Sequence, residues 1–477
     1  TGNAKTIDGT GTINNVNRVD MTASTTKTIL SSASITFTGT NQRIAIRANN
    51  TVTNNGTVTL KRITGANATS VWTNAANATL NISADLLSTG TLTALATGNT
   101  INYNGAVAQT IKATTYYHLT LSNAAAKTAG GNLTVNGNFT TSGTATFNGG
   151  TSRTHTFLGN WIINSTAATP FSFTTASTIN FNTPGTPAST SLGGTSSATI
   201  GFNNVTLNNT SGFSSSLNFN ITGTLTVSAN VTFTPAAAVV INSAATQGTI
   251  TGSGTVRVTR TAATADYLSQ YKFTTQTLTN LTVDYAGTAA QSASVLTYGN
   301  LTMSNTSAAV TASGNITVNS VLTLNADLSA GDLAMGANTL TMGATATTAG
   351  LGDVTGIVKR TTINPTTAYS FGNQFTILTF NSVGTLPTEI SVRISIGAAP
   401  SWKTDAVNRY YDVIRTGGSG FRYSIQIHYH DAELNGNTEA NISLFDNDDY
   451  PIISEHGQSG SNTTDNWAER SNYTGIA

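Results

Sequence analysis

Two histidines near residue 430 have the spacing of a metal site. His428 and His430 are separated by one residue, so in a β-strand both side chains point to the same face, and Asp431 follows directly. Imidazole and carboxylate groups on one face are suited to zinc and similar ions. The same pair also fits an ordinary polar patch on the surface of a β-sandwich. Sequence reasoning favours this second interpretation.

An acidic turn offers a different kind of metal chemistry. Asp446, Asp448 and Asp449 present oxygen ligands of the type that Ca²⁺ prefers. Their spacing lacks the glycine and the distal glutamate of an EF-hand loop. The three aspartates are a weak calcium candidate, and a polar hairpin turn is the favoured alternative. We therefore predict no resident metal and no cofactor.

Carboxylates are spread thinly over the rest of the chain. Cleavage of polysaccharides by β-helical enzymes needs paired carboxylates, or carboxylate-bound Ca²⁺ beside a basic residue. The candidates stand far apart and mostly alone: Asp85, Asp266, Asp284, Asp327, Asp332 and Asp353. No two of them occupy obviously adjacent repeat positions. We expect no enzyme and no catalytic residue, with a polysaccharide-active β-helix as the remote alternative.

Basic residues are also too sparse to follow a nucleic-acid backbone. Lys61-Arg62, Lys359-Arg360 and the pair Arg43 and Arg47 are the densest groups. Phosphate-binding and dinucleotide-binding glycine motifs are absent. The sequence therefore predicts no nucleic-acid partner.

The composition favours extended structure over coil. Only 9 % of the 477 residues are charged, whereas about 25 % is ordinary for a globular domain. β-branched Thr, Val and Ile recur throughout and suit a pleated strand. Cysteine is absent and only 8 prolines interrupt the chain. No stretch approaches the roughly 20 apolar residues of a membrane-spanning helix.

Charge is divided unevenly along the chain. Before residue 389 there are 15 Lys and Arg and 8 Asp and Glu, a net charge of +7. From Glu389 onward there are 6 and 12, a net charge of −6. A solvated surface without any partner explains this pattern, and so do complementary ends that attract one another.

Short internal repeats are the strongest structural signal. Apolar-Thr-apolar triplets recur between turns rich in Gly and Asn, and each triplet alternates with the period of a β-strand. Examples are Leu119-Thr120-Leu121, Val205-Thr206-Leu207, Leu225-Thr226-Val227, Leu301-Thr302-Met303 and Leu322-Thr323-Leu324. Short strands separated by turns predict a β-solenoid (parallel β-helix), in which each coil stacks on the last. A string of antiparallel β-sandwiches is the alternative.

Towards the C-terminus the predicted strands become longer. Residues 390–396 and 423–430 alternate cleanly, as expected for a compact antiparallel β-sandwich domain. We therefore predict an all-β protein with four regions. They are an extended segment 1–19 that offers an inter-subunit strand, a β-solenoid repeat shaft 20–355, a transition 356–388, and the C-terminal β-sandwich domain 389–477.

Two sequence features carry a family resemblance. The repeat Gly131-Asn132-Leu133-Thr134-Val135-Asn136-Gly137 resembles the β-strand repeats of secreted surface proteins of the Bacteroidetes and Ignavibacteria group. The run from Arg409 to Val413, with Tyr429 to Gly436, resembles the domain that follows those repeats. The resemblance implies a bacterial, secreted, adhesin-like protein at the cell surface, exported as in type IX secretion.

Two functions follow from this organisation. The first is an extracellular structural protein, a subunit that joins copies of itself head to tail into a surface filament or fibre, because a solenoid end offers unpaired strand edges. The second is a monomeric adhesin or stalk that displays its C-terminal domain to a surface or to cell-surface glycans. Both predict an extracellular location without a membrane span.

Overall fold

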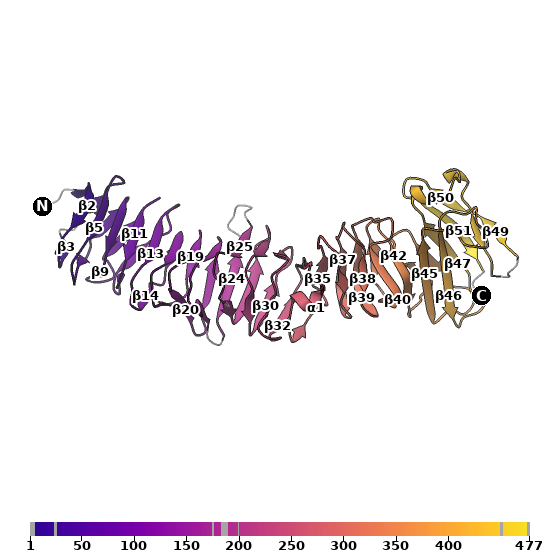
Figure 1. Ribbon diagram of the computed structural model, residues 1–477, viewed down its shortest axis with the longest axis horizontal. Coiled ribbons are helices and arrows are strands. Elements are labelled where there is room, and N and C mark those ends of the chain that lie inside the picture. Colours follow the sequence, from indigo (N-terminus) through magenta and orange to yellow (C-terminus); the bar gives the residue numbers. More distant parts are fainter. Residues whose placement is uncertain are drawn as a thin grey trace. The chain divides into compact units, whose positions relative to one another are not determined.

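The computed structural model describes residues 5–22, 26–173, 176–182, 189–198, 200–448 and 452–474. The chain forms two compact units: Thr1–Thr251 with Tyr271–Gln276, and Gly252–Gln270 with Thr277–Ala477. The structure is nearly all β, with about 16 turns of parallel β-solenoid followed by antiparallel sheets (Figure 1). The predicted fold class is confirmed.

The first unit is a stack of turns. Over most of its length each strand pairs in parallel with the strand three places later in the chain. One face contains β2 (Thr10–Ile13), β5 (Ser34–Phe37), β8 (Thr57–Leu60), β11 (Thr79–Ile82), β13 (Thr100–Tyr103), β16 (His118–Leu121), β19 (Phe139–Thr141), β22 (Trp161–Ile163), β25 (Thr190–Gly193), β28 (Phe213–Ser215) and β31 (Thr232–Pro235).

The other faces of this unit are divided into shorter sheets. Near the N-terminus these are β1 (Lys5–Ile7), β4 (Thr26–Ile29), β7 (Thr51–Asn54), β10 (Val71–Asn74) and β12 (Thr91–Thr93), and beside them β3 (Val19–Met21), β6 (Arg43–Ile46) and β9 (Arg62–Gly65). Further along are β14 (Gln109–Ile111), β17 (Ala126–Ala129), β20 (Thr146–Gly150) and β23 (Phe171–Phe173), and the pair β26 (Ile200–Phe202) and β29 (Phe219–Ile221). The remaining sheet is β15 (Thr115–Tyr116), β18 (Thr134–Val135), β21 (Thr154–Phe157), β24 (Thr178–Asn182), β27 (Asn204–Asn208), β30 (Thr224–Val227), β32 (Thr249–Gly252) and β34 (Thr275–Gln276).

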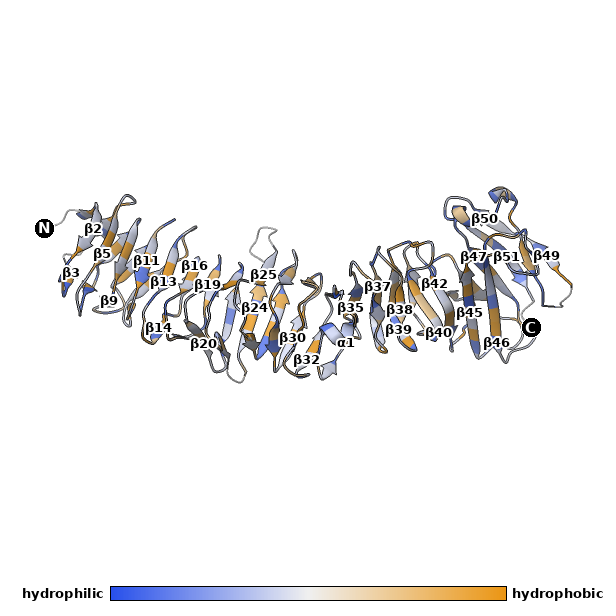
Figure 2. Cartoon of the chain, in the orientation of Figure 1, coloured by the Kyte–Doolittle hydropathy of each residue, from blue (hydrophilic) through white to orange (hydrophobic). Residues whose placement is uncertain are grey.

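The predicted triplets stack directly on one another in this unit. On β27 and β30, Val205 lies beside Leu225 and Thr206 beside Thr226. The apolar positions are buried and the threonines are half-buried on the outer face. Figure 2 shows the resulting alternation of hydrophobic and hydrophilic residues along the strands. Within the described residues every strand ladder before β42 is parallel, so the alternative of successive antiparallel sandwiches is wrong for this region.

Buried amides continue the stacking where the core is polar. The Asn54 side chain donates to Asn74 Oδ1 at 2.8 Å, and Asn74 donates to Asn99 Oδ1 at 3.4 Å. All three residues are buried. Because identical amides in successive turns satisfy one another, the ladder avoids the cost of unpaired polar groups in the interior.

The second unit begins with the same architecture. Its parallel strands are β33 (Thr255–Val258), β35 (Thr282–Tyr285), β36 (Ser292–Ala293), β37 (Thr297–Met303), β38 (Val310–Ala312), β39 (Ile316–Leu324), β40 (Leu333–Met342), β41 (Thr347–Ala349) and β42 (Val354–Arg360), with one helical turn, α1 (Tyr267–Gln270). The triplets of β37 and β39 again lie in register, Leu301 beside Leu322 and Thr302 beside Thr323.

Strand β42 is the point at which pairing changes direction. It is parallel to β40 on one side and antiparallel to β45 (Glu389–Ile396) on the other, and β46 (Arg409–Thr416) continues this layer. A second antiparallel sheet contains β43 (Ala368–Ser370), β44 (Ile377–Phe380), β47 (Tyr423–His428), β51 (Trp467–Tyr473) and β50 (Gly460–Asn462). The 3-10 helices η1 (Asp431–Glu433) and η2 (Glu439–Asn441) and the hairpin β48 (Leu444–Asp446) and β49 (Ser454–Gly457) complete the domain.

Hydrogen bonding places two region boundaries differently from the sequence prediction. The described part of segment 1–19 includes β1 and β2, which pair in parallel with β4 and β5 and so belong to the first solenoid turn. Residues 356–388 are likewise part of the structured core, because β42 ends the parallel stack and β44 pairs with β47 of the antiparallel domain. The local sequence at both places does not reveal these partners, which lie in other strands.

One turn motif stabilises the stack in each unit. In the first, the Gln109 side chain donates to Ile82 O at 2.9 Å and Ala84 O at 2.8 Å and accepts from the Gly105 amide. The buried hydroxyls of Tyr103 and Tyr116 lie 3.0 Å apart beside it. One amide therefore joins three backbone groups from two neighbouring turns.

The second unit repeats this motif with the same spacing. Gln291 donates to Val258 O and Arg260 O and accepts from the Gly287 amide, and the hydroxyls of Tyr285 and Tyr298 lie 3.3 Å apart. The pattern Tyr-x-Gly-x-x-x-Gln, followed by the second Tyr, therefore forms the same hydrogen-bonded turn in both units.

We expect Gln109→Leu to destabilise the first unit by at least about 2 kcal/mol, because buried backbone groups would lose their partners. Thr110→Val, at an exposed position of the same strand, is the matched control and should change stability by less than about 0.5 kcal/mol. Thermal unfolding followed by circular dichroism measures both. Equal melting temperatures for the two variants would contradict the role assigned to the glutamine.

Candidate functional site

A buried charge cluster joins the last solenoid turn to the antiparallel domain. Arg409, on β46, donates from Nη2 to Asp353 Oδ2 at 2.6 Å and from Nε to Glu433 Oε2 at 2.8 Å. Asp353 directly precedes β42, whereas Glu433 lies in η1. The side chains of Arg409 and Asp353 have no exposed surface. One guanidinium therefore holds two carboxylates that are far apart in the sequence.

The two predicted histidines belong to this cluster. His430 Nε2 lies 3.2 Å from Asp353 Oδ2, and His428 Nδ1 lies 3.6 Å from Asp353 Oδ1. Their acidic neighbour is therefore Asp353 and not Asp431, which follows them in the sequence. His428 is 4 % exposed, so the interpretation of the two histidines as a surface pair is wrong for this residue.

The electrostatics of the cluster favour its charged form. Burial alone would raise the pKa of Asp353, but His428, His430 and the charge of Arg409 outweigh it and hold this pKa well below the ordinary value of 3.8. The hydrogen bond to Asp353 raises the pKa of His430 above 6.5. Arg409 and His430 are therefore positively charged or chargeable groups that face the Asp353 carboxylate.

Asp353, His428 and His430 also form a possible metal triad, since their ligand atoms lie within 4.8 Å of one another. The arrangement does not suit a cation, however. The Arg409 guanidinium already contacts Asp353 Oδ2, and it would repel a divalent ion at the same buried carboxylate. We interpret the cluster as a structural network.

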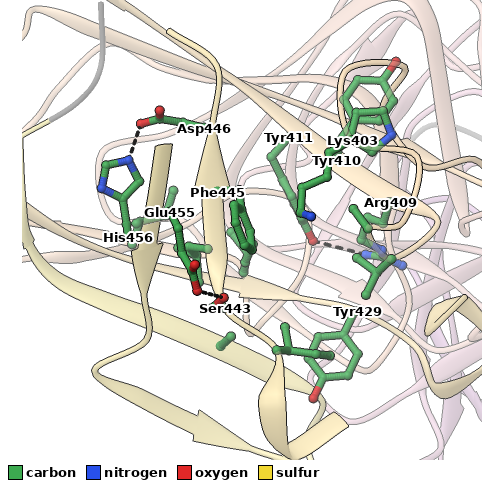
Figure 3. A pocket seen from close by; sticks show the side chains of 18 of the residues that line it. Lys403, Arg409, Tyr410, Tyr411, Tyr429, Ser443, Phe445, Asp446, Glu455 and His456 are labelled. Carbon is green, nitrogen blue, oxygen red and sulfur yellow. Dashed lines mark hydrogen bonds and ion pairs between the residues drawn. The ribbon is translucent and has the colours of Figure 1, made fainter. Parts of the chain in front are cut away.

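A cavity of about 410 Å³ lies directly over this network. Arg409, Tyr411 and His428 contribute to its lining, and the Tyr411 hydroxyl donates to His428 O at 2.5 Å. Figure 3 shows Lys403, Tyr410 and Tyr411 on one side of the cavity and the β48–β49 hairpin on the other. The Lys403 ammonium bridges the two sides, because it lies 4.4 Å from the centre of the Phe445 ring.

The hairpin side of the cavity contains the calcium candidates. Asp446 Oδ2 pairs with His456 Nε2 at 2.8 Å and also accepts from the Tyr473 hydroxyl. Asp448 is exposed and lines the same cavity, and Asp449 lies outside the described residues. One oxygen of Asp446 is therefore already used within the protein, which weakens it as a calcium ligand and supports the hairpin-turn interpretation.

Four of the six acids considered for polysaccharide cleavage have local partners of their own, whereas Asp353 belongs to the charge cluster and Asp327 is exposed. Asp85 pairs with Arg62 at 2.9 Å and Asp284 with Arg257 at 3.1 Å. The buried Asp332 carboxylate accepts from the amides of Ala326 and Leu328, and Asp266 accepts from the amide of Ser269 in α1. Each of these four carboxylates therefore has a structural role.

Sequence reasoning missed the residues that carry the site. Arg409, Tyr410 and Tyr411 were noticed only as part of a family-like run, and Asp353 only as an isolated acid. Arg409 and Asp353 are 56 residues apart, so no local pattern connects them. A signal that the sequence does offer is the arginine that opens the strand-like run Arg409–Thr416.

Comparisons with known proteins add no further information on the site: no family model, no curated protein and no solved structure matches the chain. The resemblance to β-strand-repeat surface proteins therefore remains a prediction. In the part of the chain that the structure describes, no helix is long and apolar enough to span a membrane.

We expect Arg409→Met to cost about 3–5 kcal/mol at neutral pH, because it leaves buried carboxylates without a cation. In the native protein the low pKa of Asp353 contributes stability above pH 3.8, and this contribution is lost as the pH falls. The difference in free energy of unfolding between the native protein and the variant should therefore become smaller in acid. Denaturant unfolding at pH 7 and at about pH 2, well below the ordinary value of 3.8, measures it.

Arg393→Met is the matched control, since Arg393 is exposed on the neighbouring strand β45. Its effect should stay within about 0.5 kcal/mol at both pH values. A pH-independent loss in Arg409→Met would show that only its packing matters and would contradict the electrostatic account.

Proposed function

We propose that the chain is an extracellular structural protein of a bacterial surface, which assembles end to end into a filament. The observation that carries this proposal is the presence of open strand edges on the solenoid and on the antiparallel domain. Among the described residues, β1, β2 and β3 each pair on one side only, and β46 pairs with β45 alone. Open edges accept strands from another chain.

Exposure supports this use of the edges. All four residues of β2 are exposed, and the exposed fraction of its Ile13 is 40 %. On β46, Ile414 is 62 % exposed. Apolar side chains on an open edge favour association, because burying them removes apolar surface from water. A contact between two different edges repeats from copy to copy and builds a filament when it does not close into a ring.

Charge supports the pairing of opposite ends. Residues 5–62 contain seven Lys and Arg but only two Asp, whereas the region from Glu389 onward has a net charge of −6. The two regions that contain these edges therefore carry opposite net charge and attract each other. This polarity favours head-to-tail contacts over symmetric pairs.

A second candidate function is a stalk or adhesin that displays the antiparallel domain to a surface glycan. The observation in its favour is the cavity between β46 and the β48–β49 hairpin, for which a purely structural subunit has no use. The first-turn edges share no residue with the cavity lining, whereas β46 contributes to both, because Arg409, Tyr410, Tyr411 and Val413 line the cavity.

We expect purified protein to form polymers whose length grows with concentration, and 1 M NaCl to shorten them, because the Debye length falls to about 3 Å. Ile414→Lys should weaken assembly at least tenfold by placing charge on the β46 edge. Leu351→Lys, at a 51 % exposed position away from this edge, is the matched control. Light scattering and negative-stain microscopy measure both variants. Monomers alone at high concentration and low salt would contradict the proposal.

A further inference from the structure

The cavity of the antiparallel domain is lined by aromatic rings that keep part of their surface exposed. Trp402 and Tyr410 are both half-buried at its wall. Within the described residues neither ring packs against another aromatic ring, and the Tyr410 hydroxyl makes no hydrogen bond. Flat aromatic faces open to a cavity suit ligands that present C–H groups on one face.

Polar groups complete the lining. Glu455 accepts from the Ser443 hydroxyl at 3.0 Å through Oε1, and in the described residues its second oxygen has no protein partner. Asn441 is exposed at the same cavity and adds an amide with both donor and acceptor capacity. Neighbouring hydroxyls of a sugar ring can bind such a carboxylate and amide together, while the ring packs on Trp402 or Tyr410.

We propose that this cavity binds a neutral pyranose unit of a surface polysaccharide. The volume of about 410 Å³ lies within the range of about 300–1,000 Å³ that is usual for small-ligand pockets. The proposal rests on the second candidate function, the stalk or adhesin, and names its ligand class. It does not depend on filament formation.

Charge selects neutral over acidic sugars. Asp446, Asp448 and Glu455 line the hairpin side, whereas Lys403 is paired with Asp405 at 2.9 Å. The remaining cation of the lining, Arg409, is held by Asp353 and Glu433. An added uronate would therefore be repelled by the carboxylates of the hairpin side and lose affinity.

Isothermal titration calorimetry on the full chain tests the proposal with four tetrasaccharides. Cellotetraose, xylotetraose and mannotetraose are neutral probes of different stereochemistry, and tetragalacturonic acid is the acidic probe. We expect at least one neutral probe to bind, and tetragalacturonic acid to bind at least tenfold more weakly. Tyr410→Ala and Glu455→Gln should each weaken the neutral probe at least tenfold.

Tyr117→Ala and Glu389→Gln, neither of which lines the cavity, are the matched controls and should leave binding unchanged. The proposal would be overturned if no neutral probe binds, if tetragalacturonic acid binds more tightly than the neutral probes, or if both cavity variants bind as tightly as the native protein. Circular dichroism confirms that each variant is folded, and Glu455→Gln changes an exposed residue, so its result stands if Tyr410→Ala does not fold. Polymerisation is measured separately, so failure of the filament proposal would leave the sugar-binding result intact.

Discussion

The structure depends on the in-register pairing of parallel strands between successive turns. Each turn is too short to bury an apolar face by itself, so its backbone groups and its triplet side chains find partners only in the turns above and below. Val205 on Leu225 and Leu301 on Leu322 are two instances of the same contact. A slip of one residue would expose the apolar positions and bury the threonines, which is why register is strongly specified.

Polar side chains in the interior obey the same constraint. The Asn54–Asn74–Asn99 ladder satisfies amides by repetition, whereas Gln109 and Gln291 each tie together backbone groups of two turns. Among the described residues Lys127 is buried without an acidic partner and donates to Gly105 O at 2.6 Å, and burial lowers its pKa to about 8. Backbone carbonyls of tight turns thus replace the counter-charges that this sequence lacks.

The stack ends where the antiparallel domain supplies a different set of partners. β42 pairs with β45 in the opposite direction, and the Arg409 cluster fixes this change by linking Asp353 to Glu433 and the two histidines. Such a buried network is costly unless every member is satisfied. In this network one buried oxygen, Asp353 Oδ1, has no hydrogen-bond partner and lies 3.6 Å from His428 Nδ1.

The fold was predictable from sequence because its signal is local. Triplets such as Leu119-Thr120-Leu121 contain the strand period in three residues, and the longer alternation after Glu389 indicated the antiparallel domain. The site was not predictable, because its contacts are distant: Asp353 is 77 residues from His430. The first-turn strands were also missed, since β2 has no buried residue and looks like a polar extended segment.

Engineered disulfides test the in-register stack most directly, because the native chain has no cysteine. Thr206→Cys with Thr226→Cys places two thiols on residues that lie side by side in β27 and β30. In the pair Thr206→Cys with Thr224→Cys, the second thiol is offset by two residues along the strand. The two Cα atoms then lie farther apart than the roughly 7 Å that a disulfide tolerates. Under mild oxidation the first pair should cross-link readily and the second should not. Efficient cross-linking of the offset pair, with none in the first, would contradict the account.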